Sequence, residues 1–84
     1  MRSQRIRLLE KITAGMKDSG LEQDLIEPIL SEAEDGSAAA QFVVASALER
    51  ACALPEAMNW YRLSARQGYR PASERLRQLH ISVA

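Results

Sequence analysis

The sequence predicts an all-α protein, built as a stack of helical hairpins. Apolar residues recur at spacings of three and four, the β-branched runs typical of strands are nearly absent, and glycine or proline marks the intervals between apolar segments. Five helices are expected, over residues 3–18, 22–35, 37–51, 55–67 and 71–80. Because the connections are very short, consecutive helices should run antiparallel.

Apolar stripes predict the first two helices. The stripes comprise Ile6, Leu9, Ile12 and Met16 in the first helix, and Leu25, Ile26, Ile29, Leu30 and Ala33 in the second. Gly20 between them is typical of a left-handed helix cap. Pro28 removes a hydrogen bond inside the second stripe, so that helix should begin near residues 24–27 or be kinked. Gly15 lies inside the first helix and indicates a close helix contact or a bend.

The last three helices are predicted from small apolar residues and from proline. Their apolar faces comprise Ala40, Val44, Ala47, Leu48 and Ala51 in the third helix, and Ala72, Leu76 and Leu79 in the fifth. Pro55 and Pro71 suit the first position of a helix, where the missing N–H costs nothing. Trp60 and Tyr61 of the fourth helix are expected in the core. The fifth helix should fray near Ile81.

Length, charge and cysteine usage limit the classes of function. Eighty-four residues suffice for one domain, over residues 1–84. The net charge is zero, which gives no electrostatic reason to expect a nucleic-acid partner. The single cysteine, Cys52, fits a reducing compartment and is expected to be a small buried side chain. No apolar run is long enough to span a membrane and no secretory signal is visible, so a cytoplasmic location is expected.

The charges are segregated along the chain. Residues 1–17 hold five basic side chains and one acidic one, and residues 18–35 hold seven acidic side chains and no basic one. The remainder holds six arginines and three glutamates. The simplest interpretation is a basic first helix that packs beside an acidic second one.

An internal repeat relates the middle of the chain to its end. Residues 33–40 can be laid over residues 65–72, a shift of 32 residues. The shift places Ala33 on Ala65, Gly36 on Gly68, Ala40 on Ala72, Leu25 on Ala57, Ile26 on Met58 and Ile29 on Tyr61. Glycine at the matched position lets a helix end and the chain reverse.

A longer pattern extends this repeat over residues 33–79. It comprises Ala33, Gly36, Ala38, Ala40, Gln41, Phe42, Val44, Ala45 and Leu48, followed by Glu56, Ala57, Trp60, Tyr61, Ser64, Ala65, Gln67, Gly68 and Ala72. The pattern resembles a divergent Sel-one-like repeat, a relative of the tetratricopeptide repeat. On this resemblance, residues 36–68 are the best-matching repeat, 69–80 the first helix of a further repeat and 3–35 a degenerate helix pair. Residues 50–55 replace, in shorter form, the glycine-rich loop usual in the family.

The resemblance implies a scaffold or adaptor for other proteins, with no catalytic activity and no cofactor. The third helix should present partner-binding residues on the face turned away from the core. These are Phe42, Val43, Ser46, Glu49 and Arg50. Solenoids usually need about three repeats to be stable, and Leu76, Leu79 and Ile81 would leave an open apolar edge. Self-association or a protein partner is therefore expected to cover that edge.

Other classes of function have weaker support. His80, the only histidine, is expected to be exposed, and no metal-ligand spacing, phosphate-binding glycine motif or nucleophile motif is present. The alternative is a small regulatory protein that contacts nucleic acid through helix–turn–helix geometry across Gly36. Residues 37–47 contain Gln41 but no Arg, Lys or Asn to read bases, which counts against it. Membrane-surface binding by the basic first helix is a weaker interpretation still.

Overall fold

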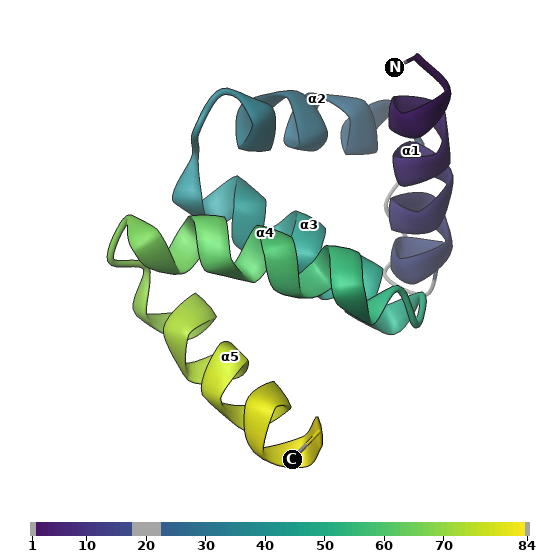
Figure 1. Ribbon diagram of the computed structural model, residues 1–84. Helices are drawn as coiled ribbons and strands as arrows, with labels where there is room; N and C mark the ends of the chain where they lie inside the picture. The colour runs from purple at the N-terminus through teal and green to yellow at the C-terminus, as the bar shows by residue number, and fades with distance from the viewer. Residues whose placement is uncertain (1, 18–22, 84) are drawn as a thin grey trace.

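The computed structural model describes the backbone of residues 2–17 and 23–83, and the side chains of residues 4–17 and 25–80. Five helices and no strand lie in these ranges (Figure 1). They are α1 (Arg2–Met16), α2 (Gln23–Glu34), α3 (Ala38–Arg50), α4 (Leu54–Arg66) and α5 (Arg70–Val83). The all-α prediction is confirmed, and each expected helix end lies within three residues of the observed one. The cap expected at Gly20 falls outside the described residues.

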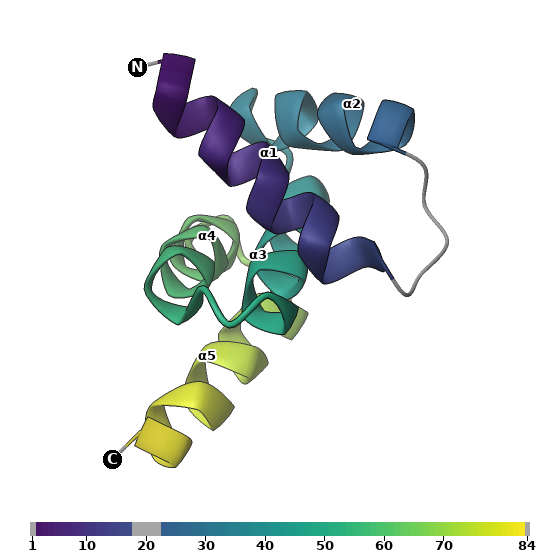
Figure 2. The same cartoon turned by 90° about the vertical axis from the view of Figure 1, so that its right-hand side faces the viewer.

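Helix α3 is the centre of the molecule, because α1, α2 and α4 all pack against it. Figure 2 shows α3 and α4 side by side, with α1 crossing over α3. The buried residues of α3 are Ala40, Gln41, Val44, Ala45, Ala47 and Leu48. Most of these side chains are small, so the neighbouring helices approach closely.

Gly15 makes the closest of these approaches. A Cβ atom placed on Gly15 would lie 1.8 Å from the carbonyl oxygen of Ala47 on α3. No side chain fits in that space, so of the two alternatives expected at this glycine, a close helix contact or a bend, the structure shows the close contact. It fixes where α1 crosses α3.

The core lies where α1, α2 and α4 meet α3. Its large members are Ile12, Met16, Ile26, Leu30, Val44, Leu48 and Tyr61, joined by Leu79 of α5, and alanines fill the spaces between them. Tyr61 is the largest fully buried side chain, with 1% of its surface exposed. Its expected place in the core is therefore confirmed. Helix α2 runs from Gln23 through Pro28, so the proline lies inside the helix.

The α2–α3 and α4–α5 turns have the same backbone structure. Gly36 and Gly68 both have left-handed φ angles, of 109° and 84°. The Gly36 N–H donates to the Ala33 carbonyl (3.1 Å), and the Gly68 N–H donates to the Ala65 carbonyl (2.9 Å). The residue after each glycine donates to the carbonyl five positions earlier, as in a Schellman cap. The backbone thus repeats at the 32-residue shift seen in the sequence.

The α3–α4 turn is a third cap of this kind, and Cys52 takes the position of the glycine. Its N–H donates to the Glu49 carbonyl (3.0 Å), and the next N–H, of Ala53, donates to the Leu48 carbonyl (2.9 Å). Cys52 has a φ of 64° and an exposed side chain. The prediction of a buried Cys52 is therefore wrong, because a left-handed cap residue lies at the turn and directs its side chain outward.

A buried amide links two of the turns. Gln41 is 5% exposed; its Nε2 donates to the Ala33 carbonyl (3.0 Å) and its Oε1 accepts from Gln67 Nε2 (3.0 Å). Ser64 adds a hydrogen bond from its hydroxyl to the Ala38 carbonyl (2.8 Å). The α2–α3 turn is thereby joined to the end of α4.

The first helix pair departs from the expected antiparallel hairpin. Figures 1 and 2 show α1 crossing α2 instead of running alongside it. Arg5 of α1 forms ion pairs with Glu27 (3.4 Å) and Glu34 (3.2 Å) of α2, and it also donates to the Ser31 hydroxyl (3.3 Å). The expected packing of a basic first helix beside an acidic second one is confirmed, but in a crossed arrangement.

Candidate protein-interaction groove

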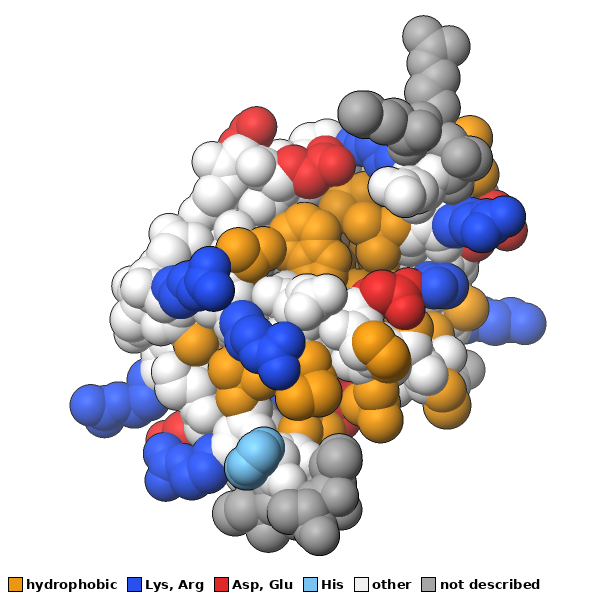
Figure 3. Space-filling view, viewed as in Figure 1, with side chains coloured by type: hydrophobic (Ala, Val, Ile, Leu, Met, Phe, Trp, Pro, Cys, Tyr) orange, Lys and Arg blue, Asp and Glu red, His pale blue; other side chains and the backbone are white. Residues whose placement is uncertain are grey.

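A groove opens between α1 and α4. It has a volume of about 380 Å³. Gln4, Arg7, Leu8 and Lys11 of α1 line one wall, and Glu56, Asn59 and Trp60 of α4 line the other. Helical spacing accounts for both walls, because residues three or four apart lie on the same side of a helix. Figure 3 shows hydrophobic side chains gathered at the centre of this face of the molecule, between α2 and α4.

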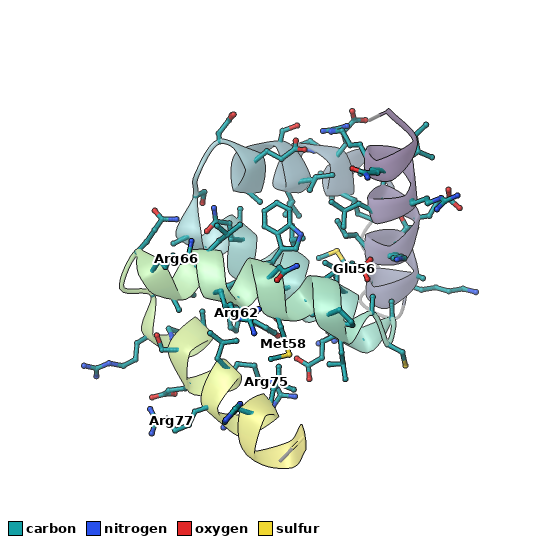
Figure 4. The ribbon with its side chains drawn as sticks, in the orientation of Figure 1. Glu56, Met58, Arg62, Arg66, Arg75 and Arg77 are labelled. Carbon is teal, nitrogen blue, oxygen red and sulfur yellow. The ribbon has the colours of Figure 1, made fainter. Side chains whose placement is uncertain are left out.

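An ion pair joins the two walls. Lys11 Nζ contacts Glu56 Oε2, and Figure 4 shows Glu56 on α4 near α1. Both side chains are exposed, so the pair adds little stability. Its consequence is geometric, since it ties α1 to α4, two helices far apart in sequence.

A second hollow continues the groove toward α2. It has a volume of about 310 Å³ and is lined by Gln4, Arg5, Leu8 and Glu34. Gln4 and Leu8 therefore line both hollows. The hydrogen bond from Arg5 to Glu34 raises the pKa of Arg5 above its ordinary value, so the Arg5 guanidinium in this wall stays charged. We call the two hollows together the α1 groove.

The α1 groove has an apolar wall surrounded by polar groups. Trp60 is half-buried and packs against the core, and Leu8 is half-buried on the opposite wall. Gln4 and Asn59 contribute side-chain amides, and Arg7 has no carboxylate partner among the described residues. A half-buried tryptophan with polar groups around it is typical of residues that dominate protein interfaces. This arrangement suits the binding of a partner's side chains.

Among the described side chains, no group of three or more His, Cys, Asp or Glu is placed to hold a metal ion. His80 is exposed, as expected. Every buried side-chain nitrogen or oxygen in the described ranges has a hydrogen-bond partner, so none of these atoms waits for a ligand.

The predicted partner-binding residues of α3 do not form the free face that the prediction required. Phe42 is half-buried, and its ring centroid lies 5.5 Å from those of Tyr61 and Tyr69. Ser46 and Glu49 both hydrogen-bond to the Tyr61 hydroxyl, at 3.2 and 2.8 Å. This part of the prediction is corrected because α4 and α5 pack over that side of α3. Val43 is half-buried and Arg50 is exposed; partner binding by the five residues stays a prediction.

Glu49 joins three helices. It accepts from the Tyr61 hydroxyl of α4 and from Arg75 Nε of α5 (3.0 Å), and a second Arg75 nitrogen also contacts it. The hydrogen bonds from Arg75 lower the pKa of Glu49 below its ordinary value of 4.5. Burial raises the pKa of Tyr61. The residue that the sequence suggested for a partner therefore holds α5 against α3 and α4.

The prediction of an open apolar edge on α5 is also corrected. Leu79 is 7% exposed, and Leu76 is half-buried against the core, because this stripe packs toward the rest of the molecule. The side chain of Ile81 falls outside the described residues. The exposed large apolar side chains in the described ranges lie elsewhere: Ile6 on α1, Leu25 on α2, and Leu54 and Leu63 on α4.

Sequence reasoning missed the α1 groove, although it contained one signal. Trp60 and Tyr61 are neighbours in a helix, so their side chains point about 100° apart and cannot both face α3. Tyr61 faces α3, and Trp60 is left to line the groove. Gln4 and Asn59 carried no signal, because their role depends on which helices meet.

No family model, curated protein or solved structure matches the chain. None of the helices in the described part of the chain is long and apolar enough to cross a membrane. A functional assignment therefore depends on the chain's own residues.

Proposed function

We propose that the chain is a non-catalytic protein-interaction module that binds a peptide segment of a partner protein in the α1 groove. The observation that carries this proposal is the half-buried Trp60 in the groove wall, opposite Leu8. Trp is the side chain most enriched among residues that dominate binding energy, and the surrounding polar groups suit the rim of an interface. We further propose that the chain is a divergent Sel-one-like repeat module, which the repeated caps at Gly36 and Gly68 support. Its proposed location is the cytoplasm, since a single cysteine fits a reducing compartment.

The position of α3 counts against the nucleic-acid alternative. A recognition helix must reach the bases from the surface of the protein. Helix α3 packs against α1, α2 and α4, and six of its 13 residues are buried. Its one described basic side chain is Arg50, at the last position of the helix.

The experiment is a selection of peptides from a random displayed library on the intact chain, followed by titration of each selected peptide. Trp60 is the only tryptophan, so its fluorescence reports occupancy of the groove directly. We expect the emission to shift on binding, and Trp60→Ala to weaken binding at least tenfold, which corresponds to about 1.4 kcal/mol. Because this variant lacks the reporter, calorimetry measures its affinity.

Two further variants make the experiment decisive. Asn59→Arg places a bulky side chain at the groove wall from an exposed position, so it should block binding without loss of core packing. Leu54→Ala removes an exposed leucine of α4 that does not line the groove, and it should bind as the wild type does. Selected peptides that bind all three variants equally well would refute the proposal.

A further inference from the structure

The 32-residue shift pairs α2 with α4, yet the two helices are covered on different faces. Ala57, Tyr61 and Ser64 of α4 are between 0% and 1% exposed, where α3 packs against them. Their equivalents on α2 are Leu25, Ile29 and Glu32. Leu25 is 52% exposed, Ile29 half-buried and Glu32 exposed. Helix α2 therefore leaves Leu25 and Glu32 exposed on the face that α4 buries, while Ile29 still packs against the core.

Helix α1 does not cover that face, because it packs on another side of α2. Its Arg5 contacts Glu27, Ser31 and Glu34. Leu25 lies instead in a stripe with Glu32 and Asp35, at spacings of seven and three residues, and Pro28 falls in the same stripe. We call this stripe the acidic face of α2. Glu32 and Asp35 are exposed and have no basic partner among the described residues.

Helix α4 carries an outer face of opposite charge. Asn59, Arg62, Leu63 and Arg66 line a hollow of about 330 Å³. Leu63 is 41% exposed. Arg62 donates to Asn59 Oδ1 (3.2 Å), and neither Arg62 nor Arg66 has a carboxylate partner in the described ranges. Figure 4 shows Arg62 and Arg66 along α4, and Figure 3 shows basic side chains over this part of the helix.

The acidic face of α2 and the outer face of α4 have similar compositions and opposite charges. Each presents one exposed leucine and two unpaired like charges about one helical turn apart. Like charges at this spacing repel one another, so each face gains when the opposite charges approach. The charge complementarity and the two exposed leucines indicate that the partner is a second copy of this chain.

We propose that the acidic face of α2 in one molecule binds the outer face of α4 in a second. Leu25 packs against Leu63, while Glu32 and Asp35 pair with Arg62 and Arg66. The two faces differ and lie on different helices, so a single contact is head-to-tail and leaves one face of each kind free, from which association can continue beyond a dimer as concentration rises. One helix pair makes a small interface, which places the association in the weak, transient class. This surface goes beyond the α1 groove, although Asn59 lines both.

Sedimentation equilibrium tests the proposal. We expect the average mass of the wild type to rise steadily up to protein concentrations of about 1 mM at low ionic strength. Added salt should weaken the association, because exposed charges are screened over about 3 Å at 1 M salt. A wild-type chain that stays monomeric throughout would overturn the proposal. A closed dimer of fixed mass would overturn the head-to-tail arrangement, since both contacts would then form within one pair of molecules.

Charge exchange identifies the surfaces. Arg62→Glu with Arg66→Glu should weaken association at least tenfold, and so should Glu32→Lys with Asp35→Lys. An equimolar mixture of these two double variants should associate again, because each supplies a face complementary to the other. Lys17→Glu with Arg77→Glu is the matched control, since it changes net charge equally at exposed positions outside both faces. Full association by the first variant alone, or no recovery in the mixture, would overturn the assignment. All substituted side chains are exposed, and circular dichroism checks that each variant is folded.

Discussion

The α3–α4 pair and the α1–α2 pair occupy equivalent places in the expected repeat, but different forces hold them. Helices α3 and α4 lie side by side and are joined by a Schellman cap, with Ala57, Tyr61 and Ser64 of α4 buried against α3 (Figure 2). Helices α1 and α2 cross, and the contacts between them include the ion pairs of Arg5. Helix α1 is anchored instead on α3, through Gly15. The α3–α4 pair is thus held by direct packing of one helix on the other, whereas α1 and α2 each pack mainly on α3 and less on one another.

The difference determines which surfaces stay open. Since α1 crosses toward α4 instead of covering α2, it forms one wall of the α1 groove and leaves Leu25 exposed. The crossed first pair therefore accounts for one wall of the α1 groove and for the exposed Leu25 of the acidic face of α2.

Breaking the anchor of α1 should have the largest effect. Gly15→Ala places a methyl group where the Ala47 carbonyl oxygen lies, so α1 must move away from α3. We expect a loss of about 2–4 kcal/mol in the free energy of unfolding, a cost typical of severe overpacking. Urea unfolding measures it. The neighbouring Ala14 is exposed, so Ala14→Gly should cost only the ordinary helix penalty of about 1 kcal/mol. Equal losses of stability in the two variants would mean that α1 does not approach α3 closely at Gly15.

The α3–α4 pair should be weakened less when one hydroxyl group is removed. Tyr61→Phe keeps the buried ring but removes the hydrogen bonds to Ser46 and Glu49. We expect a loss of about 1–2 kcal/mol, because the bond to Glu49 is charge-assisted. Tyr69→Phe is the control: Tyr69 also packs its ring beside Phe42, but it is only half-buried and its hydroxyl has no hydrogen-bond partner in the described structure. A Tyr61→Phe variant as stable as the control would contradict this role.

Gly15 and Tyr61 also illustrate how much of the structure could be predicted from the sequence. Helix positions, the glycine caps and the close approach at Gly15 followed from local pattern, because helical spacing and left-handed turns depend on adjacent residues. Which neighbour covers a helix face did not follow. Phe42 and Glu49 lie on the side of α3 that faces away from α1 and α2. Residues of α4 and α5 cover that side. Trp60 lines a groove only because α1 crosses toward α4.

The Glu49 contacts make the docking of α5 dependent on pH. The pKa of Glu49 is lower in the folded chain than its ordinary 4.5, chiefly because of Arg75. The charged carboxylate therefore stabilises the fold above pH 4.5, and this contribution is lost as the pH falls below that value toward the folded-state pKa. Glu49→Gln should be less stable than the wild type near neutral pH, and the difference should shrink on acidification. Thermal unfolding between about pH 7 and pH 3 measures it. Glu74→Gln, at an exposed position of α5, should show no such convergence.

The smallest expected effect, a gain in stability, concerns the three helix caps. Gly36, Cys52 and Gly68 lie 16 residues apart and make the same pair of backbone hydrogen bonds. The same interval separates Gly20 from Gly36 in the sequence, so the spacing itself marks residue 52 as a cap position. Only Cys52 combines a left-handed φ, of 64°, with a side chain, and that combination costs about 1–2 kcal/mol in an L-residue.

Cys52→Gly should therefore stabilise the chain by about 0.5–1 kcal/mol, once the greater flexibility of glycine in the unfolded state is subtracted. For a domain of this size the unfolding temperature should rise by about 2–8 °C. Cys52→Ser keeps the Cβ atom and replaces only the exposed thiol with a hydroxyl, so it should leave stability unchanged. If serine stabilised the chain as much as glycine, the thiol and not the backbone would be the source of the cost. A gain confined to glycine would show that the α3–α4 turn follows the same cap geometry as its two neighbours, at an energetic cost that they avoid.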